Sequence, residues 1–548
     1  MIRVVEEMKT CQDPLQKPDL ENLSAERKDR YNAVRSAIRH AWDGYSAACL
    51  GSHYHLSLRY MLGILPADDL ATISNHGISW LHGAATLYDS LDTLYLAGLT
   101  EEFEFASELV KKLPQPLVPT KTFEYSIRVL GGLLGGFAVS GDTDLLSAAI
   151  HTADAMLEGA FKSSPTPLPR MYDIVAPTSA SKISLWDTGG AIIHRLWAQA
   201  WRTSRDALNE HHRNSLAGVG SFMLEFTYLS QLTGDLKYQD AADAILHHVI
   251  DRRTSFSNLV PMLWNVMSGD AIYPSHTTLG SGSDSFYEYL LKTPILLGLE
   301  GENESSFISA KLYLDIIEES LLSNTQEHVI DSSHASMSYP VDEADRYRHL
   351  LCFVPGMLAL GTKYGPDFIN KYPQNDQVLD LAQKLVNGCY ESYVNSKSGL
   401  GPEEVRILTS GKGQSIVNPG YYLRPEFVES LFILYRTTGD SRYQEIAWEV
   451  FQNLEEHCKL ESGYAGLADT NVPNVLVDEM PSFFIGETLK YLLLTFAPDD
   501  YVGLDEFVFT TVCILFEYVM KNPNNISLKN IFRALAACST DKSFLHQT

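Results

Sequence analysis

The sequence is short of cysteine, of basic residues and of long apolar runs, and each shortage excludes a class of protein. Its 548 residues include seven cysteines, none in a C-x-x-C pair, which argues against a disulfide scaffold and against zinc or redox motifs. Lys and Arg number 42 against 68 Asp and Glu. The resulting charge of −26 argues against a nucleic-acid partner, since phosphate binding needs a basic face. No stretch approaches the roughly 18 uninterrupted apolar residues of a membrane span, and the N-terminal segment shows no apolar core of a signal peptide or anchor.

What the sequence does contain is helical periodicity. Apolar residues recur at spacings of three and four from Tyr31 to about Tyr501, and residues 427–435 form a broad apolar stripe. A Gly-Asp turn joins two such segments in three places, where the glycine suits the left-handed position after one helix and the aspartate can cap the next. Repeated helical hairpins predict an all-α fold, either an open solenoid or a closed α/α toroid. A minor β-hairpin is expected near 398–416. The turns are Gly141-Asp142, Gly234-Asp235 and Gly439-Asp440.

Four segments place ionisable side chains within strongly apolar helix. An i,i+4 acid–base pair is most often a surface salt bridge, but these groups are flanked by Leu, Phe and Gly. Spacings of three and four put the members of each group on one helix face. Because burying so many carboxylates is costly unless they bind something, we expect them to converge on the axis of a toroid. There they suit glycoside hydrolysis or the binding of a hard cation. The groups are Glu124 with Arg128, Asp284 with Glu288, Arg424 with Glu426 and Glu429, and Phe483 with Glu487.

Three further features leave alternatives open. Asp89 and Asp92 form an i,i+3 pair for which a structural role and a site role are equally compatible with the sequence. His349 precedes an apolar run, where a lone histidine usually has a structural role. The GGLLGG run at 131–136 lacks the strand and the Lys-Ser/Thr pair of a phosphate loop, so we interpret its glycines as allowing close helix packing.

Together these segments resemble the class I α-1,2-mannosidases, glycoside hydrolase family 47, over roughly residues 28–511. The resemblance implies an (α/α)7 barrel and so favours the closed toroid. It divides the chain into a polar leader (1–27), a catalytic barrel (28–515) and a divergent C-terminal tail (516–548). The motifs that carry it are HAWDGY (40–45), ATLYDSLDTLYLAGL (85–99), FEYSIRVLGGLL (123–134), LEFTYLSQLTGD (224–235), DSFYEYLLK (284–292), HLLCFVPGMLALG (349–361), LRPEFVESLFILYRTTGD (423–440), SFFIGETLKYLLL (482–494) and LDEFVFTT (504–511).

The resemblance also implies an activity and the residues for it. Members of the family are inverting hydrolases that trim terminal α-1,2-linked mannose from N-glycans with the help of a calcium ion. An inverting mechanism needs an acid and a base roughly 6.5–9.5 Å apart, with room for water between them. By resemblance, Glu124 is the general acid acting through a water, Asp284 is a second carboxylate and alternative acid, and Glu426 is the base. Arg128, His349, Arg424 and Glu429 line the sugar pocket, Phe483 lies under the ring, Glu487 lies near the metal, and Thr511 binds calcium.

Compartment and partners follow from the same resemblance. The family's disulfide corresponds to Cys352 and Cys389, which implies an oxidising compartment such as the lumen of the endoplasmic reticulum or Golgi, or secretion. The expected partner is a high-mannose N-glycan or a glycoprotein that carries one, and the chain is expected to be a monomer.

The sequence departs from the family pattern in three places. Gly218 and Pro481 stand where the family usually has glutamate, and the family's terminal Asn-Thr-Glu-Ala-His-Pro becomes Thr-Thr-Val-Cys-Ile-Leu at 510–515. The favoured hypothesis is a calcium-dependent, exo-acting α-1,2-mannosidase. The departures favour an alternative, a catalytically impaired mannose-glycan-binding protein of the same fold. A plain α-solenoid scaffold is the third hypothesis.

Overall fold

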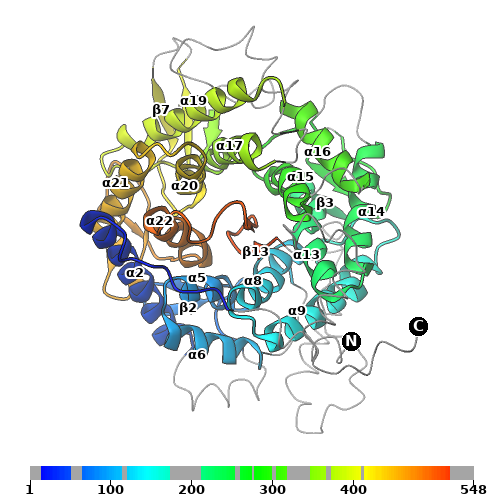
Figure 1. Ribbon diagram of the computed structural model, residues 1–548, viewed down its shortest axis with the longest axis horizontal. Helices are drawn as coiled ribbons and strands as arrows, with labels where there is room; N and C mark the ends of the chain where they lie inside the picture. Colours follow the sequence, from blue (N-terminus) through cyan, green and yellow to red (C-terminus); the bar gives the residue numbers. More distant parts are fainter. Residues whose placement is uncertain are drawn as a thin grey trace.

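The computed structural model shows a closed double ring of helices (Figure 1). It describes residues 14–50, 65–113, 120–172, 212–252, 259–273, 277–298, 304–317, 346–365, 369, 372–408 and 413–518. The first outer helix packs against the last inner helix, α2 on α22, and so closes the ring. This is the predicted (α/α)7 toroid, and the open solenoid is wrong.

Each inner helix packs against one outer helix that neighbours it in the chain. The inner helices are α5 (Leu91–Leu96), α8 (Gly131–Ser140), α13 (Met223–Thr233), α15 (Asp284–Leu297), α17 (Val354–Tyr364), α20 (Glu426–Thr438) and α22 (Leu489–Phe496). The outer helices are α2 (Ala25–Tyr45), α6 (Thr100–Val110), α9 (Thr143–Met156), α14 (Lys237–Arg252), α16 (Glu304–Ile316), α19 (Asn375–Val394) and α21 (Arg442–His457).

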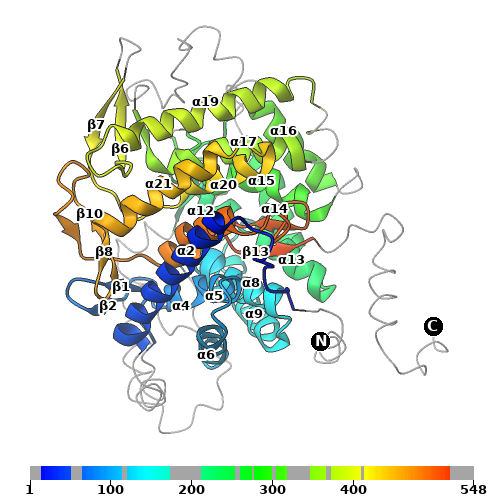
Figure 2. The same cartoon turned by 60° about the vertical axis from the view of Figure 1, so that its left-hand side comes forward.

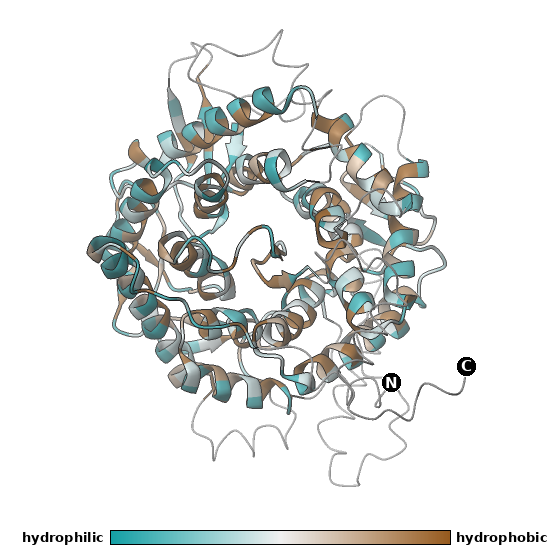
Figure 3. Cartoon of the chain, viewed as in Figure 1, coloured by the Kyte–Doolittle hydropathy of each residue, from teal (hydrophilic) through white to brown (hydrophobic). Residues whose placement is uncertain are grey.

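Burial explains why the two rings have different sequences. The outer helix α21 buries residues three and four apart, such as Tyr443, Ile446, Ala447 and Val450, and leaves its other face to solvent. The inner helix α20 is buried continuously from Phe427 to Tyr435, because it has neighbours on all sides. Figure 3 shows the same contrast, with apolar residues concentrated on the inner helices.

The Gly-Asp turns lie where the repeat predicts them. Gly141, Gly234 and Gly439 end α8, α13 and α20 with φ of 69°, 70° and 74°, a conformation that costs glycine little. Asp142 caps α9, and its side chain accepts the backbone N–H of Asp144. The aspartates at 235 and 440 likewise accept a backbone N–H from the residue two positions on.

Short antiparallel strands connect the helices, and most of them gather at one end of the barrel (Figure 2). The hairpin expected near 398–416 is present as β6 (Glu404–Ile407) and β7 (Gln414–Asn418), with β5 (Arg346–Arg348) on its edge. The other pairs are β1 (Asp69–Ala71) with β2 (His76–Ile78), β3 (Arg213–Ser215) with β4 (Leu263–Asn265), β8 (Lys459–Leu460) with β9 (Gly463–Tyr464), β10 (Gly466–Leu467) with β11 (Leu476–Val477), and β12 (Phe507–Phe509) with β13 (Leu515–Glu517).

Two short helices at the inner ring contain π turns. Residues Tyr125–Leu130 (η2) lie between α7 (Thr122–Glu124) and α8, and residues Phe484–Thr488 (η7) precede α22. Such turns are frequent at functional sites, because the extra residue redirects neighbouring side chains. Both carry side chains named in the sequence analysis, Arg128 and Glu487.

The ends of the chain bear on the predicted division into leader, barrel and tail. In the described part of the leader, Leu15 and Leu20 pack partly buried against the core, and α2 begins at Ala25. The last described residues, 515–518, include β13, and residues 519–548 lie outside the described part. The division itself stays a prediction.

Candidate active site

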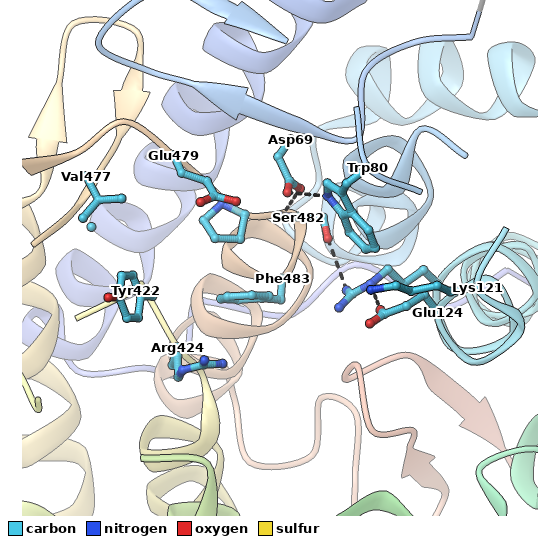
Figure 4. Close-up of a pocket in the computed structure, with 13 residues that line it drawn as sticks. Asp69, Trp80, Lys121, Glu124, Tyr422, Arg424, Val477, Glu479, Ser482 and Phe483 are labelled. Atoms are coloured by element: carbon cyan, nitrogen blue, oxygen red, sulfur yellow. Dashed lines mark hydrogen bonds and ion pairs between the residues drawn. The ribbon is translucent and has the colours of Figure 1, made fainter. Parts of the chain in front are cut away.

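A pocket of about 380 Å³ is lined in part by the short strands β1, β10 and β11. Figure 4 shows Asp69 and Trp80 on one side, Tyr422 and Arg424 on the other, and the ring of Phe483 between them. Its walls therefore combine three aromatic rings with charged groups, which suits a neutral polar ligand such as a sugar.

A buried carboxylate holds the wall that carries Trp80. Asp68 is inaccessible to solvent and accepts five backbone N–H groups from residues 80–85, at 2.7–3.1 Å. Within this loop His82 and Ala84 have left-handed φ of 55° and 56°, which is costly for residues other than glycine. The hydrogen bonds to Asp68 offset that strain and fix the loop.

Asp69 ties the same wall to the segment that carries Phe483. Its carboxylate accepts the indole N–H of Trp80 at 2.6 Å and the backbone N–H of Ser482 at 2.8 Å. Burial raises the pKa of Asp69 to about 7 despite these bonds.

Arg128 is the buried cation at the centre of one side of the site. Its guanidinium donates to Asp89 at 2.7 Å, to Glu124 at 2.9 Å and to the hydroxyl of Ser482 at 3.2 Å. Arg128 is 8% exposed and Asp89 is 0% exposed, so the i,i+4 pair of Glu124 and Arg128 is no surface salt bridge. Of the aspartate pair left open above, Asp89 therefore contacts the site, and Asp92 instead binds Lys490 at 2.7 Å.

Glu426 begins α20 and is held by His349. Nδ1 of His349 lies 2.9 Å from the Glu426 carboxylate, and Nε2 lies 2.6 Å from the hydroxyl of Tyr393. Burial alone raises the pKa of Glu426, but the hydrogen bond from His349 and the charge of Arg424 outweigh it, and the pKa lies below its usual range. His349 thus has partners on both ring nitrogens, as a structural histidine would, and it supports a carboxylate of the site.

Arg424 is oriented by a second carboxylate that the sequence analysis did not name. Its guanidinium makes two hydrogen bonds to Glu403, at 2.6 and 2.9 Å, in the forked geometry typical of strong Arg–carboxylate pairs. This bond fixes Arg424 on the pocket wall opposite Trp80 (Figure 4).

The remaining predicted carboxylates influence one another electrostatically; Glu429 and Glu487 are buried, and Asp284 is half-buried. Burial raises the pKa of Asp284 to about 7, and the charges of Glu288 and Glu426 add to the effect. Burial likewise raises the pKa of Glu429 to about 8, against the opposing charge of Lys292, and it raises the pKa of Glu487 well above its usual range. Mutual repulsion among these groups means that a nearby cation would stabilise their ionised forms.

Thr511 lies on the turn between β12 and β13, which enters the middle of the ring (Figure 1). Its backbone N–H donates to the hydroxyl of Tyr289 at 3.3 Å, and that hydroxyl donates to Glu225 at 2.7 Å. Glu225 is fully buried, and its second carboxylate oxygen has no hydrogen-bond partner among the described residues. Burial raises the pKa of Glu225 to about 8.

The oxygen atoms of Thr511 and Glu225 fit a hard cation that is held largely through water. Calcium prefers oxygen ligands, and one buried carboxylate oxygen of Glu225 lacks a hydrogen-bond partner among the described residues. In the described part of the chain, no group of three or more His, Cys, Asp or Glu side chains is arranged to hold a metal ion directly. A calcium ion at Thr511 would therefore complete its shell of six to eight oxygens with water and ligand hydroxyls.

The pocket includes residues that the sequence analysis missed. Glu124, Arg128, Arg424 and Phe483 line it as the resemblance implies, whereas Asp69, Trp80, Lys121, Tyr422, Glu479 and Ser482 were not foreseen. Asp69 and Trp80 flank a tight hairpin with no helical period, so spacing carried no signal for them. Only the adjacent acidic pair at 68–69 marked this segment in the sequence.

The three departures from the family pattern lie in different local environments. A Cβ added at Gly218 would lie 2.1 Å from the side-chain oxygen of Asn214, which is buried and occupies the space. Pro481 lines the pocket. Val512 is buried in the turn that carries Thr511.

The disulfide implied by the resemblance is present. Cys352 and Cys389 are joined, and they connect the turn at His349–Phe353 to the outer helix α19. Because His349 begins that turn, the disulfide also restrains the partner of Glu426. Among the described residues, Cys458 and Cys513 are buried thiols outside the disulfide.

The model of glycosyl hydrolase family 47 matches residues 37–518 of this sequence. The chain belongs to that family. Its match spans every predicted site residue, from Glu124 to Thr511, and the (α/α)7 fold agrees with it.

Individual family 47 proteins are similar over most of the chain. Mannosyl-oligosaccharide 1,2-alpha-mannosidase MNS1 of Arabidopsis thaliana is 34% identical over 90% of this chain and 80% of its own length. The endoplasmic reticulum mannosyl-oligosaccharide 1,2-alpha-mannosidase of Homo sapiens is 33% identical over 88% of this chain and 63% of its own length. The solved alpha-1,2-mannosidase from Trichoderma reesei, 23% identical, shares the fold with a TM-score of 0.70 over 92% of this chain and 100% of that one.

Among the described residues, none of the helices combines the length and the apolar character that crossing a bilayer requires.

Proposed function

We propose that this family 47 protein is an inverting, exo-acting α-1,2-mannosidase that removes terminal mannose from high-mannose N-glycans with calcium bound. The names of its relatives support the substrate class. The observation that carries the proposal is a pocket lined by Glu124, Arg128, Arg424 and Phe483, together with the Glu426 carboxylate that His349 holds at 2.9 Å. The pKa of Glu426 is lowered, and the pKa of Asp284 is raised to about 7.

The opposite shifts suit an acid and a base that act at the same pH. Glu426, ionised and oriented by His349, is the general base and takes a proton from the attacking water as its oxygen bonds to the anomeric carbon. The bond to the leaving sugar breaks, and its oxygen receives a proton. Asp284 still holds a proton near neutral pH, and Glu124, acting through a water, is the second candidate donor. Attack by water on the opposite face inverts the anomeric configuration.

The pocket wall would bind one terminal mannose. Phe483 offers its ring as a floor, and Arg128 and Arg424 are held by carboxylates so that their free N–H groups can reach sugar hydroxyls. Glu429 lies deeper, bonded to the hydroxyl of Tyr491 at 3.1 Å.

Thr511 would hold calcium through its hydroxyl and carbonyl oxygens, with Glu487 and Glu225 binding the water shell of the ion. When bound, calcium supplies a positive charge that orients sugar hydroxyls and favours a distorted ring. The charge would also stabilise the ionised forms of Glu429 and Glu487, whose pKa values burial raises.

A secretory compartment agrees with this function. The disulfide between Cys352 and Cys389 favours an oxidising lumen, and one relative is named for the endoplasmic reticulum. We keep the prediction of a monomer.

The alternative is a protein that binds mannose glycans without turnover, and the departures at Gly218, Pro481 and Val512 favour it. One experiment separates the two functions. Mannose release from a Man9 glycan is measured with wild type and with Glu426→Gln, in calcium and in chelator, beside glycan binding by calorimetry.

We expect chelator to abolish the release of mannose. Glu426→Gln should lower the rate of release at least about a thousandfold, because Glu426 acts in the chemical step. Glu456→Gln, at an exposed carboxylate on the outer helix α21, is the matched control and should retain full activity. Activity that is insensitive to chelator, or unchanged in Glu426→Gln, contradicts the mechanism. Glycan binding without release in wild type selects the binding protein.

A further inference from the structure

The turn that carries Thr511 is compact. Its ends are joined by hydrogen bonds from the N–H of Thr510 to the carbonyl of Ile514 and from the N–H of Cys513 to the carbonyl of Thr510, both 2.9 Å. Cys513 adopts a left-handed φ of 58°. The position of Thr511 therefore depends on how this whole turn is held in the ring.

Two buried charged side chains, Lys490 and Asp92, hold the 510–515 turn in place. Nζ of Lys490, on the inner helix α22, donates to the carbonyl of Cys513 at 2.6 Å and binds Asp92, on α5, at 2.7 Å. Asp92 in turn accepts the backbone N–H of Leu515 at 3.2 Å. Lys490 is 0% exposed and Asp92 is 2% exposed. Neither residue lines the pocket, so neither is explained by contact with a sugar.

Packing against helix α8 also fixes the position of the turn. Ile514 lies on the glycines of the GGLLGG run in α8, where a Cβ added at Gly135 would be 2.3 Å from its Cγ2 atom. A side chain on that face would push the turn away from the helix. The glycine run thus allows close packing, as the sequence predicted: Gly131 and Gly135 face this turn, whereas Gly132 and Gly136 pack against Tyr88 and Leu145.

We propose that Lys490 and Asp92 are positioning residues, which seat the 510–515 turn so that Thr511 can hold calcium. This inference rests on the proposed function, since it concerns the same metal. It assigns a role to a buried ion pair that the acid–base chemistry does not use.

Both contacts are made to the main chain of the turn, at the Cys513 carbonyl and the Leu515 N–H. Contacts to the main chain remain possible when the side chains of the turn change. This explains how the turn can differ from the family sequence at 512–515 and still present Thr511. A buried ion pair is weak evidence for stability, because desolvation offsets its attraction, and defining one geometry is a better-attested role.

The test measures calcium affinity by calorimetry on chelator-stripped full-length protein. Lys490→Met should weaken calcium binding about 10- to 100-fold, the usual effect of removing a group that orients a metal ligand. Cys513→Ala should leave the affinity within about twofold, because the carbonyl that Lys490 binds remains. Hydrogen exchange of the 510–516 amides should rise in Lys490→Met and stay unchanged in Cys513→Ala.

A matched control removes another buried cation far from the turn. Arg30→Met breaks the 2.8 Å pair between Arg30 on α2 and Glu445 on α21, and it should lower thermal stability without changing calcium affinity. If Lys490→Met does not fold, the double variant Asp92→Leu with Lys490→Met removes both charges together. Wild-type affinity and unchanged exchange in either folded variant would overturn the inference.

Failure of the proposed function is distinguishable from failure of this inference. Wild type that binds no calcium and releases no mannose refutes the function. Hydrogen exchange then still tests whether Lys490 positions the 510–515 turn. Faster exchange of the 510–516 amides in Lys490→Met supports that role, and unchanged exchange rejects it.

Discussion

Removing the charge of Arg128 should destabilise the protein in a way that depends on pH. Arg128→Met keeps most of the side-chain stem but leaves Asp89, which is 0% exposed, without its 2.7 Å partner. Stranding a buried charge in this way costs about 3–5 kcal/mol of unfolding free energy near neutral pH. Burial already raises the pKa of Asp89, and Arg128 is the principal charge that opposes the rise.

The sign of the pH effect follows from proton counting. In the variant, folded Asp89 holds a proton that the unfolded chain, with a carboxyl pKa of about 3.9, has lost at neutral pH. The folded state then binds more protons than the unfolded state, so stability rises as pH falls. The rise is about 1.4 kcal/mol for each pH unit between neutral pH and the unfolded pKa.

Urea unfolding of wild type and variant at about pH 5, 6 and 7 measures this difference. The penalty of Arg128→Met should be about 2–3 kcal/mol smaller at pH 5 than at pH 7. Adding Asp89→Asn should recover much of the loss at pH 7. Lys384→Met breaks an exposed i,i+4 pair with Asp380 and should cost about 0.3–0.5 kcal/mol at each pH. An equal penalty at all three pH values, or no rescue by Asp89→Asn, would refute the reasoning.

Three further predictions concern other parts of the molecule. The general acid must hold a proton, and the pKa of Asp284 is about 7, so kcat/KM for mannose release should fall as pH rises above about 7. A pH–rate profile that stays flat to about pH 9 contradicts this prediction. Replacing Cys352 and Cys389 by alanine should lower the unfolding free energy by about 4 kcal/mol for a closed loop of 37 residues, and an unchanged urea midpoint would exclude it. Gly218→Ala should cost about 1–3 kcal/mol by overpacking against Asn214, and less in an Asn214→Ala background, as a double-mutant cycle of unfolding free energies would measure.

The local structure could be predicted well from the sequence because it depends on short-range interactions. Helical spacing located α20, and the Gly-Asp turns located the ends of inner helices, since left-handed glycine and a capping aspartate act within a few residues. The i,i+4 spacing of Glu124 and Arg128 correctly placed both side chains on one helix face, where they form a 2.9 Å ion pair.

Helical spacing could predict the site only where it lies on or next to helices, and the family resemblance supplied Thr511, which lies on a turn. Asp69, Trp80 and Glu403 come from loops and strands, and their spacing in the sequence has no relation to their places in the site. Asp69 and Trp80 line the pocket, and Glu403 holds Arg424. Asp68 is not distinguishable from any other acidic residue until the 80–85 loop wraps around it.

The sequence by itself determined the helical hairpins, the closed ring implied by the family resemblance and the residues that are available to the chemistry. It could do so because helix propensity, capping and motif identity are properties of neighbouring residues. Only the tertiary structure decided which of two similar aspartates serves the pocket. Asp89 meets Arg128, whereas Asp92, three residues on, meets Lys490 below the Thr511 turn. Their environments differ because ring closure brings together segments far apart in the sequence: Asp92 accepts the N–H of Leu515, and Arg128, the partner of Asp89, donates to Ser482. Burial there raises the pKa of both carboxyl groups.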